Sequence, residues 1–405
     1  MDHIVVDPGQ GTGRHLGQAV CDLVREYGSA DSLHAVCADG TAVNTGYKSG
    51  AIAETERNLG KPLQWLICLK HCNELPLRHV FDELDGGMGT SGPNSFKGEL
   101  GQAVAGDVYK EEVVKFDKIG SSLDEIPNDI FDKLSRDQKL LYRYAKAVIF
   151  GTVPDNLKDQ KPGPLCHARW LTLALRILIL YTRTANPSEA LKKAVKFIVQ
   201  VYVVIWFKIS KQDAFTMGVK HLFEMMLLIK TQTQDVQAIV KKCLQHNAYF
   251  SHPENLLCSM LTDSDCEVRK EAVVKLLAAR NGKKKKPRSR IARGIRFFQP
   301  PLLDWNSTSY TKMIDWKSKK VIVTEPPVIS HLSDDELKAA FASPLDLPKY
   351  PCHTTSVERC VKLVSEASKQ VYGEEARHGL ILSRVAVREM RAAFDTKKDY
   401  AVKPS

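Results

Sequence analysis

Residues 33–75 read LHAVCADGTAVNTGYKSGAIAETERNLGKPLQWLICLKHCNEL, and this stretch decides the fold that we expect. Leu33–Ala38 is a short apolar run that ends at Asp39, and Leu63–Cys68 is a second apolar run that leads into His71. Each run is followed by a stretch with helical spacing of apolar residues. Strands that alternate with helices indicate a parallel sheet. The stretch therefore predicts an α/β unit.

The neighbouring residues extend this unit. We expect helices over residues 43–59 and 75–84, and another over residues 14–26 after a strand formed by Ile4-Val5-Val6. A glycine-rich turn, residues 8–13, joins that strand to the helix. It lacks both the Lys-Ser/Thr pair of a P-loop and the last glycine of the dinucleotide fingerprint. We therefore expect no nucleotide site and no small-molecule substrate there.

The middle of the chain has helical periodicity almost throughout and predicts an all-helical block. Helices are expected over residues 140–148, 169–181, 190–208, 215–229, 235–247, 252–260 and 267–279. For the third of these, Asn186 is the expected N-cap, followed by Pro187 in the first helical position. Residues 298–327 are expected to be irregular, a capping box at Ser333 to open a helix, and further helices to cover residues 356–372 and 374–395.

Composition limits the class of protein. With 405 residues, of which 43% are apolar, the chain is long enough to form a real core. Ten cysteines without a repeated spacing, and an opening sequence without a secretion signal, predict reduced thiols in the nucleus or cytosol. The apolar runs 170–181 and 197–207 are too short to cross a bilayer, which takes roughly 20 residues. We therefore expect no membrane association.

The positive charge is concentrated in one tract. The net charge is +11, and eight cations fall between residues 283 and 296 without an acid: Lys283, Lys284, Lys285, Lys286, Arg288, Arg290, Arg293 and Arg296. So dense a tract repels itself and stays solvated. It is interpreted as a solubilising loop, a nuclear-import signal or an arm that binds phosphates.

Two residues at strand ends are candidates for chemistry. Asp39 follows the first apolar run, and an acid at the carboxyl end of a parallel strand lies where ligand and metal sites form. Its alternative interpretation is an aspartate that caps the turn before Gly40. His71 has three interpretations: a zinc ligand with Cys68 and Cys72, a packed structural residue, or a member of a site with Asp39.

Three stretches resemble the hAT superfamily of cut-and-paste DNA transposases. The first carries an acid, an asparagine turn and a Cys-x-x-His pair, the second an Arg-Trp pair, and the third a Ser-Glu-Arg-like segment that opens a helix. The matching residues are Asp39, Asn44, Cys68, His71, Asn73 and Leu75, then Arg169 and Trp170 within HARWLT, then Thr355, Ser356, Glu358, Arg359 and Ser365. Val357 and residues 360–364 depart from the family pattern, so the chain resembles a divergent subfamily.

This resemblance implies a ribonuclease-H-like fold in which three carboxylates hold two divalent ions, Mg²⁺ or Mn²⁺, for cleavage and transfer of DNA strands. By position, Asp39 is the second acid and Glu358 the third, and both are the expected metal ligands. His71 takes a role beside them. Trp170 is expected either to stack on DNA, with Arg169 next to it, or to be a core residue.

The first acid of that pattern should stand on an opening strand, for which residues 1–32 leave no room. We therefore expect an N-terminally truncated sheet that keeps about three of five strands and exposes an apolar edge. Asp2 and Asp7 fall in the wrong places to replace the acid. The expectation is a protein that has lost strand cleavage, with Mg²⁺ or Mn²⁺ as cofactor only in an active form.

The expected architecture is an incomplete ribonuclease-H-like α/β sheet interrupted by a large all-helical insertion. We expect a partial core at 1–74, the insertion at 75–282, a basic tract and linker at 283–330, and C-terminal helices that complete the core at 331–405. DNA is the expected partner, and a homo-oligomer is possible. The alternative function is a non-catalytic nuclear protein that binds nucleic acid or other proteins through the helical scaffold and the basic tract.

Overall fold

The computed structural model describes residues 11–89, 95–132, 134–163, 165, 169–210, 214–247, 249–282 and 299–347. The side chains of residues 169 and 214–216 are outside this description. Three expected segments also lie outside the described residues: the strand at residues 4–6, the basic tract, and the helices over residues 356–395. Within the described residues the chain is mostly helical and has a small parallel sheet.

The sheet consists of β1 (Ala35–Ala38) and β2 (Gln64–Ile67), which pair in parallel with Ala35 opposite Gln64 and Ala38 opposite Ile67. Both strands and their parallel direction were predicted from the apolar runs. The strand β2 is buried along its whole length, whereas β1 is partly exposed. The carboxyl ends of both strands therefore meet at one edge of the sheet, just ahead of Asp39 and Cys68.

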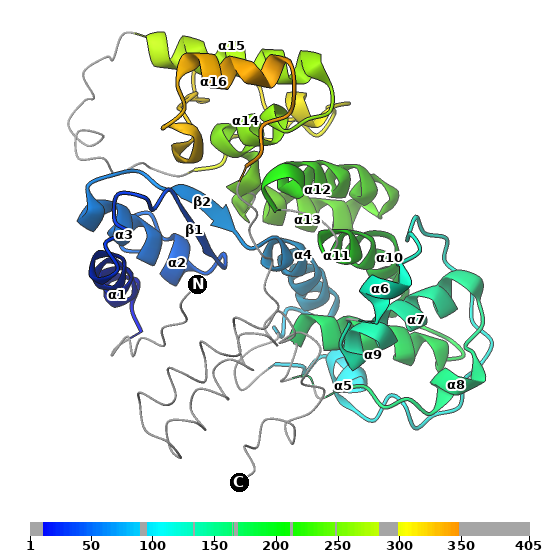
Figure 1. Ribbon diagram of the computed structural model, residues 1–405. Coiled ribbons are helices and arrows are strands. Elements are labelled where there is room, and N and C mark those ends of the chain that lie inside the picture. Colours follow the sequence, from blue (N-terminus) through cyan, green and yellow to red (C-terminus); the bar gives the residue numbers. More distant parts are fainter. Residues whose placement is uncertain are drawn as a thin grey trace.

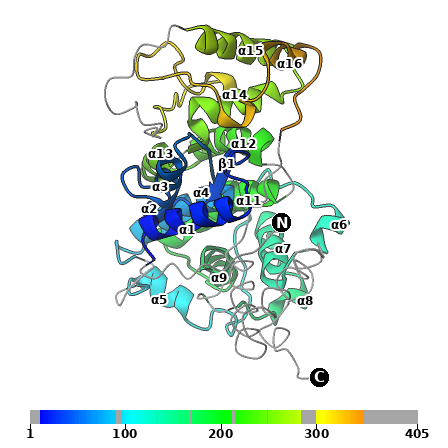
Figure 2. The ribbon, with the colours of Figure 1, turned by 60° about the vertical axis from the view of Figure 1, so that its left-hand side comes forward.

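The two faces of the sheet pack against different layers. Trp65 and Ile67 form a small core with Ile52 of α3 (Ala51–Leu59), and α1 (Gly13–Glu26) covers α3 from outside. Leu66 points the other way, into the large core of the helical block. Figures 1 and 2 show the resulting arrangement, with α1 to α3 on one side of the sheet and the helical block beyond α4.

The helix predicted over residues 43–59 is wrong, because the chain forms two helices there, α2 (Ala42–Thr45) and α3. The turn between them packs tightly: a Cβ placed on Gly50 would lie 2.5 Å from the Gly46 nitrogen. A Cβ on Gly13 at the start of α1 would lie 2.3 Å from the Ser49 carbonyl oxygen. Backbone-to-backbone contact with α1 therefore breaks a helix that local periodicity favours.

Helix α4 (Leu69–Leu84) begins earlier than the predicted residue 75 and continues through Pro76. The backbone N–H of Cys68 donates to the Ala38 carbonyl oxygen at 2.7 Å, which closes the strand pair immediately before the helix. His71 consequently lies in the first turn of α4. Residues 74 and 75, the expected meeting point of core and insertion, both lie inside this helix.

The helical block agrees closely with the pattern of the sequence. It contains α5 (Glu99–Ala105), α6 (Asn128–Phe131), α7 (Arg136–Phe150), α8 (Asp155–Lys158), α9 (Arg169–Thr182), α10 (Glu189–Phe197), α11 (Val203–Ile209), α12 (Ala214–Leu228), α13 (Gln234–Asn247), α14 (Pro253–Leu261) and α15 (Cys266–Asn281). A π-helical turn, Ile198–Tyr202, joins α10 to α11. Ser188, rather than the expected Asn186, caps α10, because its side chain accepts from the Leu191 N–H.

The apolar runs of the sequence lie in α9 and in the α10–α11 segment, both of them buried. Arg176 of α9 is buried as well, and its Nη1 donates to the carbonyl oxygens of Val104 and Gly106 at 2.9 and 2.8 Å. Among the described residues, no helix is both long and apolar enough to span a membrane.

Residues 299–347 pack against the helical block and, as expected, are irregular up to α16. One antiparallel bridge pairs Leu303 with Ile314. Ser333 and Glu336 form the predicted capping box of α16 (Asp334–Lys338), which a 3-10 turn, Ala339–Phe341, extends. This segment packs with α14 and α15 at the top of the view in Figure 1.

Candidate functional site at the carboxyl end of the strands

Asp39 follows β1 directly and is fixed by its own turn. Its Oδ1 accepts three hydrogen bonds, from the Thr41 N–H at 2.9 Å, the Thr41 hydroxyl at 2.6 Å and the Asn44 amide at 2.8 Å. The interpretation of Asp39 as an aspartate that caps the turn is thus confirmed for its Oδ1 atom. No described residue bonds to Oδ2, so one carboxylate oxygen remains available for a ligand.

The electrostatic environment keeps Asp39 ionised. Burial acts to raise the pKa of its carboxyl group, but the hydrogen bonds from Thr41 and Asn44, helped by the nearby His71, outweigh burial and hold the pKa below the usual value of 3.8. Donors that bond to the charged form stabilise that form. Asp39 therefore presents a fixed negative charge at neutral pH, with its free oxygen at the sheet edge.

His71 lies beside this carboxylate. A Cβ placed on Gly40 would lie 3.0 Å from His71 Cδ2 and 3.4 Å from Nε2, so the ring rests against the backbone that follows Asp39. Burial lowers the pKa of His71, Arg78 lowers it further, and Asp39 opposes both. Since neither ring nitrogen bonds to a described residue, His71 offers a neutral imidazole with a free acceptor at neutral pH.

The zinc interpretation of His71 finds no support. Cys72 donates its thiol to the Asn247 carbonyl oxygen at 3.7 Å. In the part of the chain that the structure describes, no three His, Cys, Asp or Glu residues are grouped so that they could hold a metal ion. Asp39 and His71 together are thus a pair, which needs further ligands to bind a metal ion tightly.

Two residues of the helical block continue the site along α4. Arg78 lies two turns beyond His71, and its guanidinium carbon is 5.8 Å from the centre of the Trp170 ring at the start of α9. Trp170 is partly buried and packs against the large core, as the core interpretation expects. Arg78 was missed by the sequence analysis, although its distance of seven residues from His71 places it on the same helix face.

Three other expected site elements lie outside the described residues: Glu358, the tract from Lys283 to Arg296, and the side chain of Arg169. Of the family-like residues that are described, Asn44 bonds to Asp39 as shown above. Asn73 is buried, and its amide donates to the Tyr202 carbonyl oxygen at 3.2 Å, which ties α4 to the helical block.

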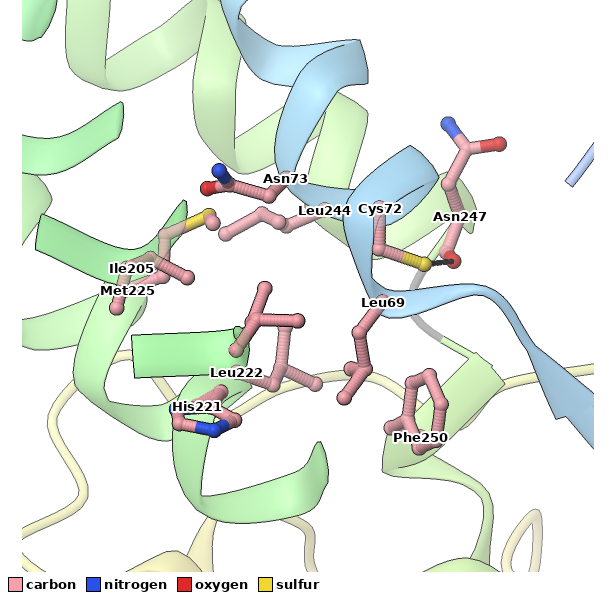
Figure 3. Close-up of a pocket in the computed structure, with 11 residues that line it drawn as sticks. Leu69, Cys72, Asn73, Ile205, His221, Leu222, Met225, Leu244, Asn247 and Phe250 are labelled. Atoms are coloured by element: carbon pink, nitrogen blue, oxygen red, sulfur yellow. Dashed lines mark hydrogen bonds between the residues drawn. The ribbon is translucent and has the colours of Figure 1, made fainter. Parts of the chain in front are cut away.

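A cavity of about 20 Å³ lies behind α4, away from the Asp39 pair. Figure 3 shows its lining by Leu69, Cys72 and Asn73 from α4 and by residues of the neighbouring helices, among them His221. Burial, with Lys208 and Lys70 nearby, lowers the pKa of His221 to about 4. The cavity has room for about one water molecule. Neither Asp39 nor His71 lines it, so it is separate from the candidate site.

Comparisons with known proteins add no relative. No family model matches the chain, and neither a curated protein nor a solved structure matches it significantly.

Proposed function

We propose that the chain is a transposase-derived, DNA-binding protein of the hAT type, in which the edge of the sheet at Asp39 receives a DNA strand. The observation that carries this proposal is the pairing of Asp39 with His71 at the carboxyl ends of two parallel strands. The two residues are separated in sequence by a helix pair and a strand. The parallel pairing of β1 and β2 brings them together, and the family resemblance depends on this topology.

The neighbourhood of the pair suits a nucleic acid. From His71, α4 leads to Arg78, which combines a delocalised cation with the aromatic ring of Trp170. Cations that meet phosphates and aromatic rings that stack on bases are the usual means of holding a DNA strand. In this proposal Asp39 and His71 contact the reacting region of the strand, and Arg78 and Trp170 hold its flank.

The carboxylate also fits a divalent ion. Asp39 offers a single free, ionised oxygen, which is the hard ligand that Mg²⁺ and Mn²⁺ prefer. Such ions, when bound in a pair, supply stabilisation for the attacking and leaving oxygens of phosphodiester cleavage. One carboxylate does not hold a pair of ions, so we propose Glu358 as a second ligand. With these two acids alone, the protein binds DNA and does not cleave it.

DNA affinity tests the proposal directly. The full chain is titrated into a fluorescently labelled duplex of about 30 base pairs at several salt concentrations, with and without Mn²⁺, and anisotropy is recorded. We expect binding that weakens steeply with salt and strengthens with Mn²⁺ in the wild type but not in Asp39→Asn. Absence of binding at low salt would contradict the proposal.

The basic tract favours a second candidate, a nuclear protein that binds nucleic acid through residues 283–296 alone. The two candidates differ in what the Asp39 site contributes. If neutralising the tract removes all DNA binding, and Mn²⁺ has no effect that depends on Asp39, the second candidate is correct. A fluorescent fusion of the chain tests nuclear entry, and sedimentation tests whether it forms a homo-oligomer.

A further inference from the structure

Next to Arg78 lies a surface with a surplus of positive charge, formed by α4 and α13, which pack side by side. Arg78 and His79 stand on α4, and Lys242 and His246 stand on α13. His79, Lys242 and His246 are exposed, and Arg78 is half-buried. We call these four residues the α4–α13 surface.

These side chains influence one another directly. Partial burial of the ring lowers the pKa of His79 although part of the side chain is exposed. Arg78, Lys242 and His246 lower it further, and Asp82 alone opposes them. Arg78 also acts on Cys243, which follows Lys242 directly on α13. The groups therefore lie within electrostatic range of one another. At neutral pH Arg78 and Lys242 are cations, and the lowered pKa leaves His79 a neutral imidazole that can donate a hydrogen bond.

Acidic groups offset only part of this charge. Asp82, the one acid that acts on the pKa of His79, pairs with Arg78 at 3.6 Å. Burial raises the pKa of Asp82, although Arg78 and His79 act to lower it. Among the described residues, His79, Lys242 and His246 have neither a hydrogen bond nor an ion pair. Three adjacent exposed donors without partners favour an external anion.

The surface is continuous with the candidate site. Arg78 belongs to both, because it lowers the pKa of His71 on one side and lies over Trp170 on the other. His71 and Arg78 are seven residues apart, which is about 10 Å along a helix. Lys242 and His246 are one turn apart on α13 and are thus neighbours on its exposed side. The α4–α13 surface therefore adjoins the candidate site at Arg78.

We propose that the α4–α13 surface binds the phosphate backbone of the DNA strand that enters the Asp39 site. This inference rests on the proposed function and goes beyond it, because it assigns the flanking contacts to His79, Lys242 and His246. Lysine and imidazole donors without acid partners suit phosphate oxygens, which carry a full charge at every nucleotide. Arg78 fixes the register of the strand between the site and Trp170.

The test compares Lys242→Gln with Lys270→Gln, an exposed lysine of α15 that is remote from α4 and loses the same charge. DNA affinity of the full chain is measured by anisotropy as a function of salt. Loss of one phosphate contact changes the slope of log K against log salt by about 0.9. A variant that binds as tightly as the wild type at 1 M salt therefore binds about eightfold more weakly than the wild type at 0.1 M salt. We expect this loss in Lys242→Gln, a larger loss with His246→Gln added, and no change in Lys270→Gln.

The outcomes separate the two proposals. If the wild type binds DNA and the Lys242 and His246 variants bind as tightly as Lys270→Gln, the inference about the surface is wrong and the proposed function stands. If the wild type does not bind DNA at low salt, both fail together. Circular dichroism of each variant shows whether folding is retained, which we expect because all three substituted side chains are exposed.

Discussion

Replacement of Asp39 separates its structural role from its role in binding. In Asp39→Ala the Thr41 N–H, the Thr41 hydroxyl and the Asn44 amide all lose their acceptor. A hydrogen bond of this kind contributes about 0.5–1.5 kcal/mol net, and water replaces part of each bond at this half-exposed turn. We expect the free energy of unfolding to fall by about 2 kcal/mol.

Asp39→Asn is the matched control, because its amide oxygen can accept the same bonds without the charge. We expect this variant to lose no more than about 1 kcal/mol at neutral pH. Since the pKa of Asp39 is lowered on folding, the stabilisation that its charge provides is present above the usual aspartate pKa and is lost as the pH falls through the folded value. The stability difference between the wild type and Asp39→Asn should therefore disappear in acid.

Urea unfolding measures these differences as a shift of the midpoint at a constant slope. The reasoning is refuted if Asp39→Ala matches the wild type within about 0.5 kcal/mol, or if Asp39→Asn is as unstable as Asp39→Ala. Either result would mean that the turn does not depend on Oδ1.

Three further predictions concern the Asp39 site and the packing of α15. By NMR titration, His71 should have a pKa below 6.5, and Asp39→Asn should lower it again, because the carboxylate that favours the charged ring is gone; an increase would show that the two groups do not interact. Gly40→Val should shift the His71 ring resonances without unfolding the protein, since a Cβ there meets Cδ2 at 3.0 Å. Arg269→Met should cost about 3–5 kcal/mol in urea unfolding, because the buried guanidinium donates to three carbonyl oxygens; a cost under about 1 kcal/mol would contradict this account.

The helices and the parallel strands could be predicted because their residues follow regular periods. The start of α4 at Leu69 could not, since residues 69–74 have no capping signal and Pro76 argues against a continuous helix. Tertiary contacts decide there: the Cys68 N–H bonds to Ala38, and the helix buries Leu77 and Val80 in the core. Packing of this kind overrides local preference.

Only the part of the site that lies at the strand ends could be predicted from the sequence. The pair of Asp39 and His71 follows from two parallel strands whose carboxyl ends share an edge. The α4–α13 surface does not follow in this way, because Lys242 and His246 come from a helix far along the chain. Their charges look like an ordinary solvated helix face until α13 is seen beside His79.

The distance between the Asp39 and Glu358 carboxylates is the most direct test of the central claim that the chain carries a transposase-type site. It is measured in a crystal soaked with Mn²⁺, whose anomalous signal locates the ion independently. We predict Mn²⁺ bound to Asp39 Oδ2, with the two carboxylates about 4–7 Å apart, which suits ions spaced about 4 Å apart. Carboxylates on separate surfaces, with no Mn²⁺ at Asp39, would contradict the account.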